Sequence, residues 1–410
     1  MAALGAAGTR SAVARELCDA QSVRQTAGSE GNGDETRVRP PSIRDVARLA
    51  GVSHQTVSRV LNGHPSIRDA TRSRVLAVMD QLQFRPNRAA RMLSMRRSKM
   101  IGVLAAAVGA HYGPASSVRA VEDAAREHGF YTTVAHLASV EPDAISAAVE
   151  DLLGQDVEGL VIVVPRTAVL SRLASLPVNV PIVAAQGELD DSGGIPVASV
   201  DQRAGVRMLM GYLIRQGHER IKHLAGPPDW NDARSRLRAY EAELRAADLP
   251  VLPPVYGDWT ADSGYQAGLA LLREAARGGA GGLGFSAVFS ANDQMALGLM
   301  HAFREAGLDV PHDVSVAGFD NIPESEHFWP PLTTVSQDFA ALGTRCVTLL
   351  VGAIGRAYGG PDASGQGVPG LPDANMRDAV VSAVVQPELV VRNSVRGLNA
   401  ARRPSPASNS

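Results

Sequence analysis

One side of a predicted helix carries an unusual set of polar residues. The stretch Gly51–Gly63 reads GVSHQTVSRVLNG, and its apolar residues recur at positions i, i+3 and i+4, as they do along one side of a helix. The other side has neither glutamate nor lysine, which a merely solvated helix would normally mix. It carries instead His54, Gln55, Ser58, Arg59 and Asn62. Glutamine can pair bidentately with adenine and arginine with guanine, so this side is predicted to contact DNA.

The residues of this helix divide into two predicted roles. We expect His54, Gln55 and Arg59 to contact base edges, because the second helix of a helix-turn-helix enters the major groove with its N-terminus first. Short donors suit phosphate oxygens, helped by the helix N-terminus. The short donors here are Ser53, Thr56, Ser58 and Asn62. A three-helix module that docks on another protein remains the alternative.

The elements around this helix have the spacing of a helix-turn-helix. Ser42 opens the sequence SIRD, a capping box with aspartate in place of glutamate, so a helix is predicted to begin there. Gly51 ends that helix, and Ser53 caps the next one after a short turn. A third helix is predicted over residues 69–83. Residues 41–86 are therefore predicted to form an all-α helix-turn-helix head.

A short arginine-rich segment follows the head. It reads FRPNRAARML over residues 84–93, and Asn87 is placed to cap a helix of about two turns after the proline. One side of that helix would carry Ala90 and Leu93, and the other would carry Arg88. So short a helix is marginal in water, and small residues beside one leucine suit insertion between base pairs in the minor groove. An ordinary linker remains the alternative.

The charge distribution separates the basic head from the rest of the chain. The protein has 410 residues and a net charge of −2, with 45% hydrophobic and only 4% aromatic residues. Residues 41–100 hold 12 Lys and Arg against 3 Asp and Glu, a net charge of +9, whereas residues 101–410 carry −11. A basic module on an acidic body is typical of a DNA-binding domain attached to another domain.

Composition also indicates the compartment. Arginines interrupt any signal-peptide core near the N-terminus, and no uninterrupted apolar run approaches the roughly 18–20 residues of a membrane span. The two cysteines, Cys18 and Cys346, suggest no disulfide framework. We therefore expect a cytoplasmic protein without a membrane segment. Residues 1–40, 358–377 and 396–410 are expected to be disordered.

Short apolar runs alternate with helical patterns over residues 99–395. Strands are predicted at 101–106, 131–135, 160–164, 221–224, 255–256, 287–290 and 314–317, and helices at 118–128 and 142–153. Such alternation is typical of parallel sheets covered by helices on both faces. Ligands of these sheets bind at the carboxyl ends of the strands, so the residues after each run are candidate ligand contacts.

The residues after these strands suit a sugar ligand. They are Arg236, Trp259, Asn292, Asp320, Gln337 and Phe339. A sugar needs a flat apolar face to stack on and paired polar groups for its hydroxyls. Other roles stay open: Arg236 could form a surface ion pair, and Asn292 and Asp320 could be turn residues. Asp293 is predicted to cap a helix rather than contact a ligand.

No pattern in the chain indicates catalysis. We find no nucleophile–base pair, no metal-ligand cluster and no phosphate-binding glycine loop, so no enzyme activity, cofactor or metal is expected. His218 and His223 flank the start of a predicted strand, and a structural role is predicted for both.

Two stretches of the head resemble the LacI/GalR family of bacterial transcription regulators. They read IRDVARLAGVSHQTVSRVLN from residue 43 and RPNRAARML from residue 85. The resemblance implies that His54 and Gln55 are the first two base-reading positions, and that Leu93 is the wedge of a hinge helix within residues 87–98. It also implies a homodimer on a pseudo-palindromic DNA operator, because two hinge helices insert together.

The resemblance continues to about residue 354 and resumes at QPELVVR, residues 386–392. It implies a two-lobed effector domain of the periplasmic-binding-protein type (type I), in which Arg236, Asn292 and Asp320 match effector contacts. The sequences around Trp259 and from Gln337 to Phe339 are similar to a family member that binds galactosides, which suggests a galactoside-like ligand. Gln186 stands where that member has a carboxylate, which leaves the identity of the sugar open.

These observations predict a DNA-binding transcriptional repressor whose operator affinity is controlled by a small molecule, a sugar, bound between two lobes. A sugar-binding transport receptor and an enzyme on the same α/β scaffold remain as alternatives. Whether the sugar releases the protein from DNA or promotes binding stays open.

Overall fold

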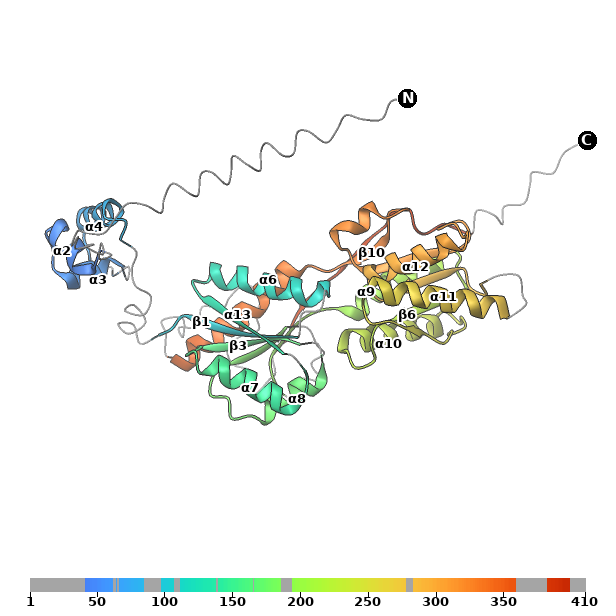
Figure 1. Cartoon of the computed structure of the whole chain (residues 1–410), viewed down its shortest axis with the longest axis horizontal. Coiled ribbons are helices and arrows are strands. Elements are labelled where there is room, and N and C mark those ends of the chain that lie inside the picture. The colour runs from blue at the N-terminus through green and yellow to red at the C-terminus, as the bar shows by residue number, and fades with distance from the viewer. Residues whose placement is uncertain are drawn as a thin grey trace, which may run out of the picture. The chain divides into compact units, whose positions relative to one another are not determined.

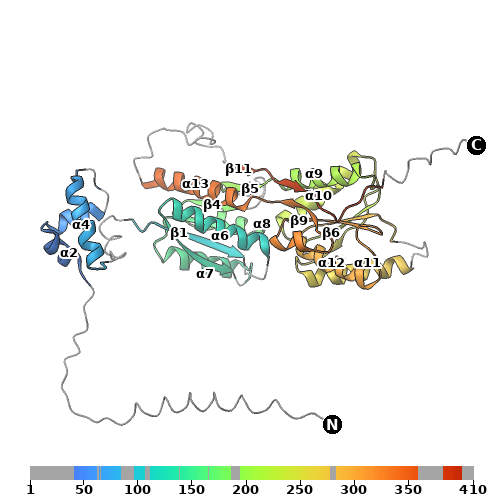
Figure 2. The same ribbon diagram turned by 90° about the horizontal axis from the view of Figure 1, so that it is seen from above.

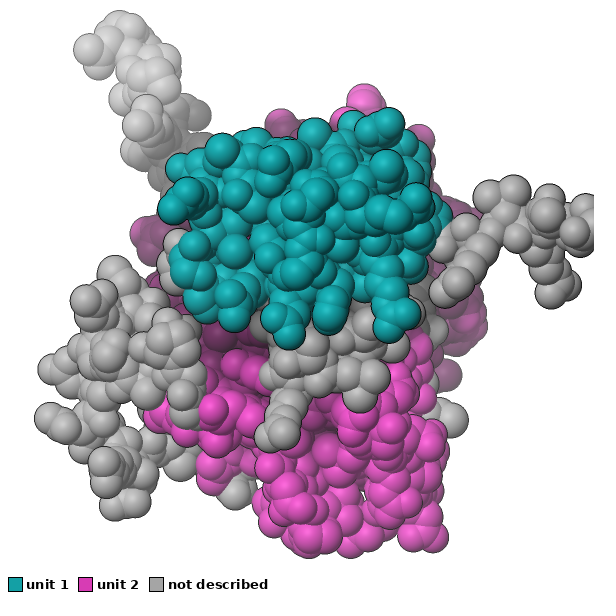
Figure 3. Space-filling model, turned by 90° about the vertical axis from the view of Figure 1, so that its left-hand side faces the viewer, with its two compact units in different colours: residues 1–91 teal, residues 92–410 magenta. Residues whose placement is uncertain are grey.

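The structure describes most of the chain. It is a computed structural model that describes residues 41–61, 64, 66–84, 97–106, 111–137, 139–164, 166–185, 194–277, 283–358 and 382–398. The predictions for residues 1–40, 87–96 and 359–377, and for the tail from residue 399, lie outside this part. The predicted disorder is wrong for Tyr358, which belongs to a helix, and for residues 396–398, where the Leu398 N–H donates to the Gln216 carbonyl at 2.7 Å. The chain divides into two compact units, residues 1–91 and 92–410, which Figure 3 shows in separate colours.

The described part of the first unit contains three helices, α2 (Ile43–Ala50), α3 (His54–Leu61) and α4 (Asp69–Gln81). The capping box predicted at Ser42 is confirmed, because the Asp45 carboxylate accepts from the Ser42 backbone N–H at 2.9 Å and from the Ser42 hydroxyl at 2.7 Å. These two bonds lower the pKa of Asp45. Gly51 ends α2 in the left-handed conformation with a φ of 64°, as the helix-turn-helix prediction requires.

A small apolar core fixes the orientation of α3. Its buried members are Val46, Ala47, Ala50, Val57, Val60 and Val75. Val57 and Val60 point into this core, so the opposite side of α3 faces outward. The core shared with α2 and α4 thus holds the outward surface of α3 in a fixed orientation.

The second unit contains two lobes, each with a six-stranded sheet (Figure 1). The first sheet has the order β11-β5-β4-β3-β1-β2. Its strands are β1 (Met100–Ala106), β2 (Tyr131–Leu137), β3 (Gly159–Val163), β4 (Ile182–Ala185), β5 (Val197–Val200) and β11 (Ser382–Val385). All of its strand pairs are parallel, as predicted.

The second sheet repeats this arrangement with the order β12-β10-β9-β8-β6-β7. Its strands are β6 (Ile221–Ala225), β7 (Val255–Tyr256), β8 (Ala287–Ser290), β9 (Ser315–Asp320), β10 (Thr333–Ser336) and β12 (Glu388–Val390). Only β12 runs antiparallel to its neighbour, β10. In both sheets the strand order reverses beside the first strand of the lobe, which is where open α/β sheets place their ligands.

Helices cover both faces of each sheet, as Figures 1 and 2 show. In the first lobe these are α6 (Tyr112–Glu127), α7 (Pro142–Leu153), α8 (Thr167–Ser175) and α13 (Phe339–Tyr358). In the second lobe they are α9 (Gln202–Arg215), α10 (Asn231–Ala246), α11 (Ala261–Arg277) and α12 (Asp293–Glu305). The helix predicted over residues 118–128 begins six residues earlier, at Tyr112.

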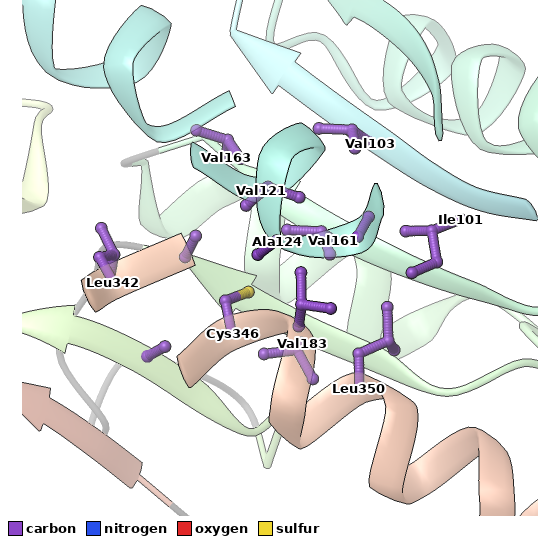
Figure 4. Close-up of a cluster of buried hydrophobic side chains, with 14 of the residues drawn as sticks. Ile101, Val103, Val121, Ala124, Val161, Val163, Val183, Leu342, Cys346 and Leu350 are labelled. Atoms are coloured by element: carbon purple, nitrogen blue, oxygen red, sulfur yellow. The ribbon is translucent and has the colours of Figure 1, made fainter. Parts of the chain in front are cut away.

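Alternate residues of the central strands enter different cores. In β3, Val161 and Val163 pack with α6 and α13 in the cluster drawn in Figure 4. The intervening Ile162 packs on the other face, in a cluster with α7 and α8. This burial on both faces explains why the strand reads as a continuous apolar run.

Helix α13 is long and apolar enough, by length and composition alone, to cross a membrane. Six of its residues lie in the core of the first lobe: Phe339, Leu342, Cys346, Val347, Leu350 and Ile354. The core helix of a globular domain passes the same test of length and composition, and this burial is typical of such a helix.

Three segments connect the two lobes in the described chain, after β5, β10 and β11. The Asp201 N–H donates to the Val385 carbonyl at 2.9 Å, so the first and third segments are bonded to each other. The Gln202 side-chain amide donates to the Gln337 side-chain oxygen at 2.9 Å, which joins the first and second. The first connecting segment is therefore hydrogen-bonded to both of the others.

Two histidines of the second lobe are buried and neutral. His218 bonds the Ser286 hydroxyl and the Arg396 carbonyl, and His223 lies between the rings of Tyr240 and Phe289. Burial lowers the pKa of both imidazoles to about 4. These contacts agree with the structural role predicted for them.

The depressed histidine pKa values predict acid sensitivity of the second lobe. The unfolded chain takes up protons below pH 6.5 whereas the folded imidazoles stay neutral to about pH 4, so their stabilising contribution is lost as the pH falls through this window. The His218→Gln variant lacks this titrating imidazole. The native protein is expected to exceed the variant in unfolding free energy, and this difference should shrink by about 2 kcal/mol from pH 7.5 to 5.0. Urea unfolding followed by tryptophan fluorescence measures it, and a deficit that stays constant over this range would contradict the assignment.

Candidate DNA interface and ligand cleft

Helix α3 presents the predicted base-reading residues to solvent. His54, Gln55 and Arg59 are all exposed. The Ser53 hydroxyl accepts from the Thr56 N–H at 3.1 Å and lies 2.9 Å from the Thr56 hydroxyl, so Ser53 caps α3 as predicted. The helix has no acidic residue. The surface is therefore a capped, rigid helix N-terminus with exposed donors, which is the form that major-groove readers take.

Some residues of the predicted DNA interface are only partly exposed or fall outside the described chain. Thr56 and Ser58 are half-buried. The remaining predicted contacts, which lie outside the described residues, are Asn62, Asn87, Arg88, Ala90 and Leu93.

A small cleft opens between the two lobes of the second unit. The first lobe lines it with residues 111–114, at the start of α6. The second lobe contributes Trp230, Asp232, Arg236, Trp259, Asn292 and Asp320, and Gln337 comes from the second connecting segment. Nearly all of these second-lobe residues follow or end parallel strands of one sheet, so the fold itself gathers them.

Arg236 is the centre of the polar cluster in the cleft. It is buried, and its guanidinium donates to the Gln202 side-chain oxygen at 2.9 Å and to the Ala291 carbonyl. Its Nη2 lies 3.5 Å from an Asp320 carboxylate oxygen. The guanidinium plane also lies over the Phe319 ring, 3.8 Å from its centroid. These contacts exclude the surface ion pair that the sequence left open for Arg236.

Asp320 is held at the end of β9 by a left-handed backbone with a φ of 108°. Its carboxylate accepts from the Gln337 side-chain amide at 2.7 Å. Burial raises the pKa of Asp320 to about 6, against the opposing effects of Arg236 and Gln337. Asp320 therefore ends the strand as a pocket residue, and near neutral pH its carboxylate can accept from a hydroxyl.

The capping prediction at the start of α12 is wrong. Asn292, not Asp293, caps the helix, because its side-chain oxygen accepts from the Met295 N–H at 2.9 Å. The Asn292 amide also donates to the Trp259 carbonyl at 3.0 Å. Asp293 instead accepts from the Ile322 N–H at 2.9 Å and, at 2.5 Å, from a buried threonine hydroxyl of β10. Burial, followed by the neighbouring Asp320, raises the pKa of Asp293 well above its ordinary value.

Trp259 is fixed in the cleft by several contacts. Its backbone is left-handed, with a φ of 76°, and its side chain is buried. The indole packs against the backbone of Gly226, where a Cβ atom would come within 2.2 Å of the ring. It also meets Trp230 with 5.5 Å between ring centroids. The indole N–H is buried and has no hydrogen-bond partner among the described residues.

Two of the predicted ligand contacts do not line the described cleft. Phe339 begins α13 and is buried in the core of the first lobe, where its ring lies 5.8 Å from the Tyr112 ring. Because Tyr112 lines the cleft, Phe339 supports the cleft wall from behind. Gln186 lies outside the described residues.

Several cleft residues were not predicted from the sequence. These are Gln202, which bonds Arg236, and the lining residues His111, Tyr112, Trp230 and Asp232. Trp230 and Asp232 lie at the start of α10, the helix that follows β6. Arg236 was predicted as a ligand contact from its place early in this helix, so the same reasoning would have found Trp230 and Asp232. Gln202 was missed because it follows β5, a strand that was not predicted. His111 was missed because the sequence after β1 showed no pattern.

A helix-turn-helix head and a two-lobed domain with a polar, aromatic cleft define a class of protein in which DNA binding and small-molecule binding share one chain. Residues 42–87 match the model of the bacterial regulatory proteins of the lacI family, and residues 210–395 match the periplasmic binding protein-like domain. The lactose operon repressor of Escherichia coli (strain K12) is 37% identical over 319 residues, which are 77% of this chain and 85% of that repressor. The chain belongs to the LacI family.

Other relatives and solved structures agree with this assignment. The transcriptional regulator CelR of Thermobifida fusca is 34% identical over 335 residues, 78% of this chain and 93% of CelR. The lac repressor dimer bound to operator and the anti-inducer ONPF has a TM-score of 0.71 and 32% identity, over 87% of this chain and all of the other. A CelR–cellobiose complex has a TM-score of 0.59 and 30% identity, over 86% of this chain and 99% of the other.

Proposed function

We propose that this protein is a transcriptional repressor whose affinity for a DNA operator is controlled by a sugar bound between its two lobes. The observation that carries the proposal is the joining of an exposed reading surface on α3 to a cleft that both lobes line. The repressors of the lactose and ribose operons and the CelR–cellobiose complex support the same combination. We place the DNA-binding domain at 41–86, the hinge at 87–98 and the effector and dimerisation domain at 99–395.

The mechanism is a shift between two populations of the effector domain. A sugar that binds one arrangement of the lobes more tightly than the other stabilises that arrangement and changes the position of the hinge. Arg97, in the described end of the proposed hinge, is anchored to the buried Glu158 by bonds of 3.1 and 2.5 Å, and the Lys99 N–H bonds the same carboxylate at 2.8 Å. Movement of the first lobe would therefore reach the hinge directly.

The functional form is proposed to be a homodimer. Trp329 is 80% exposed and borders a cavity of the second lobe that Leu308, Val310, Arg304 and Asp309 also line. An exposed indole is typical of protein interfaces. The solved lac repressor that has a TM-score of 0.71 to this chain is a dimer bound to operator, and a symmetric dimer would match a pseudo-palindromic site.

Two alternatives are less well supported. A transport receptor has no use for the basic head or for the exposed donors of α3. We propose that the protein has no enzyme activity, because its relatives are repressors and its cleft residues bond one another in a manner that suits binding. A cytoplasmic location follows from the proposed access to DNA.

Operator binding and sugar binding test the proposal in one experiment. An operator selected from random duplex DNA is bound by the full chain, and galactosides, glucosides, pentoses and sugar phosphates are then titrated in. We expect one neutral sugar to change the dissociation constant of the operator complex, and the sign of the change distinguishes inducer from corepressor. A protein that selects no DNA sequence, or that responds to no sugar, would contradict the proposal.

Arg59→Ala is expected to weaken the operator complex by about 1–3 kcal/mol and to relax base preference at one position. The reason is the loss of a bidentate contact from an exposed guanidinium to a base edge. Arg74→Ala removes the same charge from the exposed surface of α4 and should change affinity less and equally for all sequences. Fluorescence anisotropy on the selected operator and its single-base variants measures both. Equal weakening of all sequences by Arg59→Ala would show a phosphate contact instead.

A further inference from the structure

Access to the cleft between the lobes is restricted. Every lining side chain that comes from the second lobe or from the second connecting segment is at most 9% exposed. The indole N–H of Trp259 and the Nδ1 atom of His111 are buried as well. A molecule the size of a sugar ring can reach these groups only when the lobes move apart. The contacts that hold the lobes together therefore decide when the cleft admits a ligand.

An ion pair joins the two lobes beside the cleft. Arg166 belongs to the first lobe, between β3 and α8, and Asp229 belongs to the second lobe, between β6 and α10. The guanidinium Nη1 of Arg166 lies 3.1 Å from the Asp229 carboxylate. The same guanidinium lies 5.6 Å from the ring centroid of Trp230, within the range of a cation–π contact. One side chain of the first lobe thus contacts two consecutive residues of the second.

Local structure fixes both partners of this ion pair. The Arg166 carbonyl accepts from the Val169 N–H at 3.1 Å, at the start of α8. On the other lobe, the Trp230 N–H donates to the Pro227 carbonyl at 3.1 Å, which closes a turn that contains Asp229. Asp229 also stands directly before the N-cap of α10, where the helix dipole favours negative charge. Each lobe therefore holds its own partner in place, and the pair forms when the lobes come together.

Aromatic contacts between the lobes accompany the ion pair. The rings of His111 and Trp230 meet at 82° with 5.3 Å between their centroids, and Tyr112 packs against the apolar cores of both lobes. Burial lowers the pKa of His111, so its imidazole stays neutral near pH 7 and does not repel the Arg166 guanidinium. The ion pair is the salt-sensitive part of this contact, because the Arg166 and Asp229 side chains are 30% and 57% exposed.

We infer that Arg166 and Asp229 form a lock that holds the lobes closed and thereby controls the entry and release of the effector. The inference rests on the proposed function, in which the arrangement of the lobes sets operator affinity. The lock stabilises the closed arrangement and so helps to fix the ratio of closed to open chains. A ligand that favours closure then has to supply only the remaining difference in free energy.

The distance between the lobes tests the lock directly. Nitroxide labels are attached through the substitutions Ser171→Cys in α8 and Ala242→Cys in α10, in a Cys18→Ser chain, because both positions are exposed and Cys346 is buried. Double electron–electron resonance measures the distance, and excess unlabelled protein removes distances between copies. Arg166→Glu places like charges opposite each other, so the ratio of open to closed chains should rise by about ten-fold or more. Arg166→Gln only removes the attraction and should raise this ratio by about three-fold.

Two further variants make the result specific. Arg166→Glu combined with Asp229→Arg reverses the pair, and the ratio should return to within about three-fold of the native value. Arg126→Glu is the matched control, because Arg126 pairs with Asp123 at 2.7 Å within α6 and the same charge change breaks an ion pair of one lobe only. It should leave the distance unchanged. Operator affinity, measured by fluorescence anisotropy, should shift in Arg166→Glu and return in the double variant.

The outcomes separate the lock from the proposed function. Native and Arg166→Glu chains with the same distance distribution would overturn the inference, and so would an opening that Asp229→Arg does not reverse. If Arg166→Glu does not fold, Arg166→Gln decides, because it adds no repulsion. These results would leave the proposed function standing, since the native chain would still select an operator and respond to a sugar. A native chain that selects no operator would overturn the proposed function, and the measured distances would still decide whether the lock exists.

Discussion

Arg236→Ala should remove the response to sugar while operator binding persists. The substitution deletes a buried guanidinium that holds Gln202, the Ala291 carbonyl and Asp320 in one cluster at the base of the cleft. Loss of such a charged donor, with its partners left unsatisfied, costs about 2–4 kcal/mol of ligand binding, which corresponds to roughly 30- to 700-fold in the dissociation constant. The head does not depend on this cluster for its own core, so DNA affinity should remain.

The control for this variant lies on the same helix. Arg238→Ala removes an exposed guanidinium two residues further along α10 and should leave sugar affinity unchanged. Arg236→Lys keeps the charge but loses the planar fork, so it should also fail to bind sugar if geometry matters. Calorimetry for the sugar and fluorescence anisotropy for the operator separate the two functions. If Arg236→Ala responds at the native sugar concentration, Arg236 has a structural role only.

The stability of the same variant should depend on pH. Burial already raises the pKa of Asp320 to about 6, and Arg236 opposes this rise. Without Arg236 the pKa of Asp320 should rise further. The folded state of the variant then holds a proton on Asp320, which the unfolded state has lost, over a wider range of pH. The stability deficit of Arg236→Ala should therefore grow as the pH rises from 5 to 8. Adding Asp320→Asn should remove this growth, because no carboxyl remains to titrate.

Local rules in the sequence predicted the elements that local contacts form. The capping box at Ser42 and the cap at Ser53 involve residues three apart, and both are present. Apolar runs such as that of β3 are buried on both faces and were found for that reason. Strand β5, with the residues VASV, is short and weakly apolar, so it was missed together with the connecting segment that follows it.

The errors at the site come from contacts that are distant in the sequence. Asn292 and Asp293 can both cap a helix, and the sequence alone favoured the wrong one. Asp293 is drawn away from the cap by the Ile322 N–H and by a hydroxyl of β10, which lie 29 and 41 residues away in the chain. His111 faces Trp230 only because the two lobes meet across the cleft. No periodicity or capping rule contains such information.

Gly226→Ala should damage the ligand cleft almost as severely as the loss of Arg236. Gly226 directly follows β6, and a Cβ atom there would lie 2.2 Å from the indole of Trp259, well inside the contact distance of two carbons. The indole cannot simply withdraw, because it packs on Trp230 and its backbone already occupies the left-handed region. The aromatic surface and its free N–H would move together. We expect sugar affinity to fall by about ten-fold or more, which is at least about 1.4 kcal/mol.

A second glycine of the same lobe provides the matched control. Gly211 lies within α9, and a Cβ atom there would meet only the flexible end of Arg215, at 3.2 Å. Gly211→Ala should therefore leave sugar binding intact and stabilise the helix by roughly 0.5–1 kcal/mol. The quenching of tryptophan fluorescence by acrylamide reports whether Trp259 has moved in Gly226→Ala. Native sugar affinity in that variant would show that the cleft tolerates displacement of Trp259, and the binding surface would then have to be assigned to Trp230 and the Arg236 cluster alone.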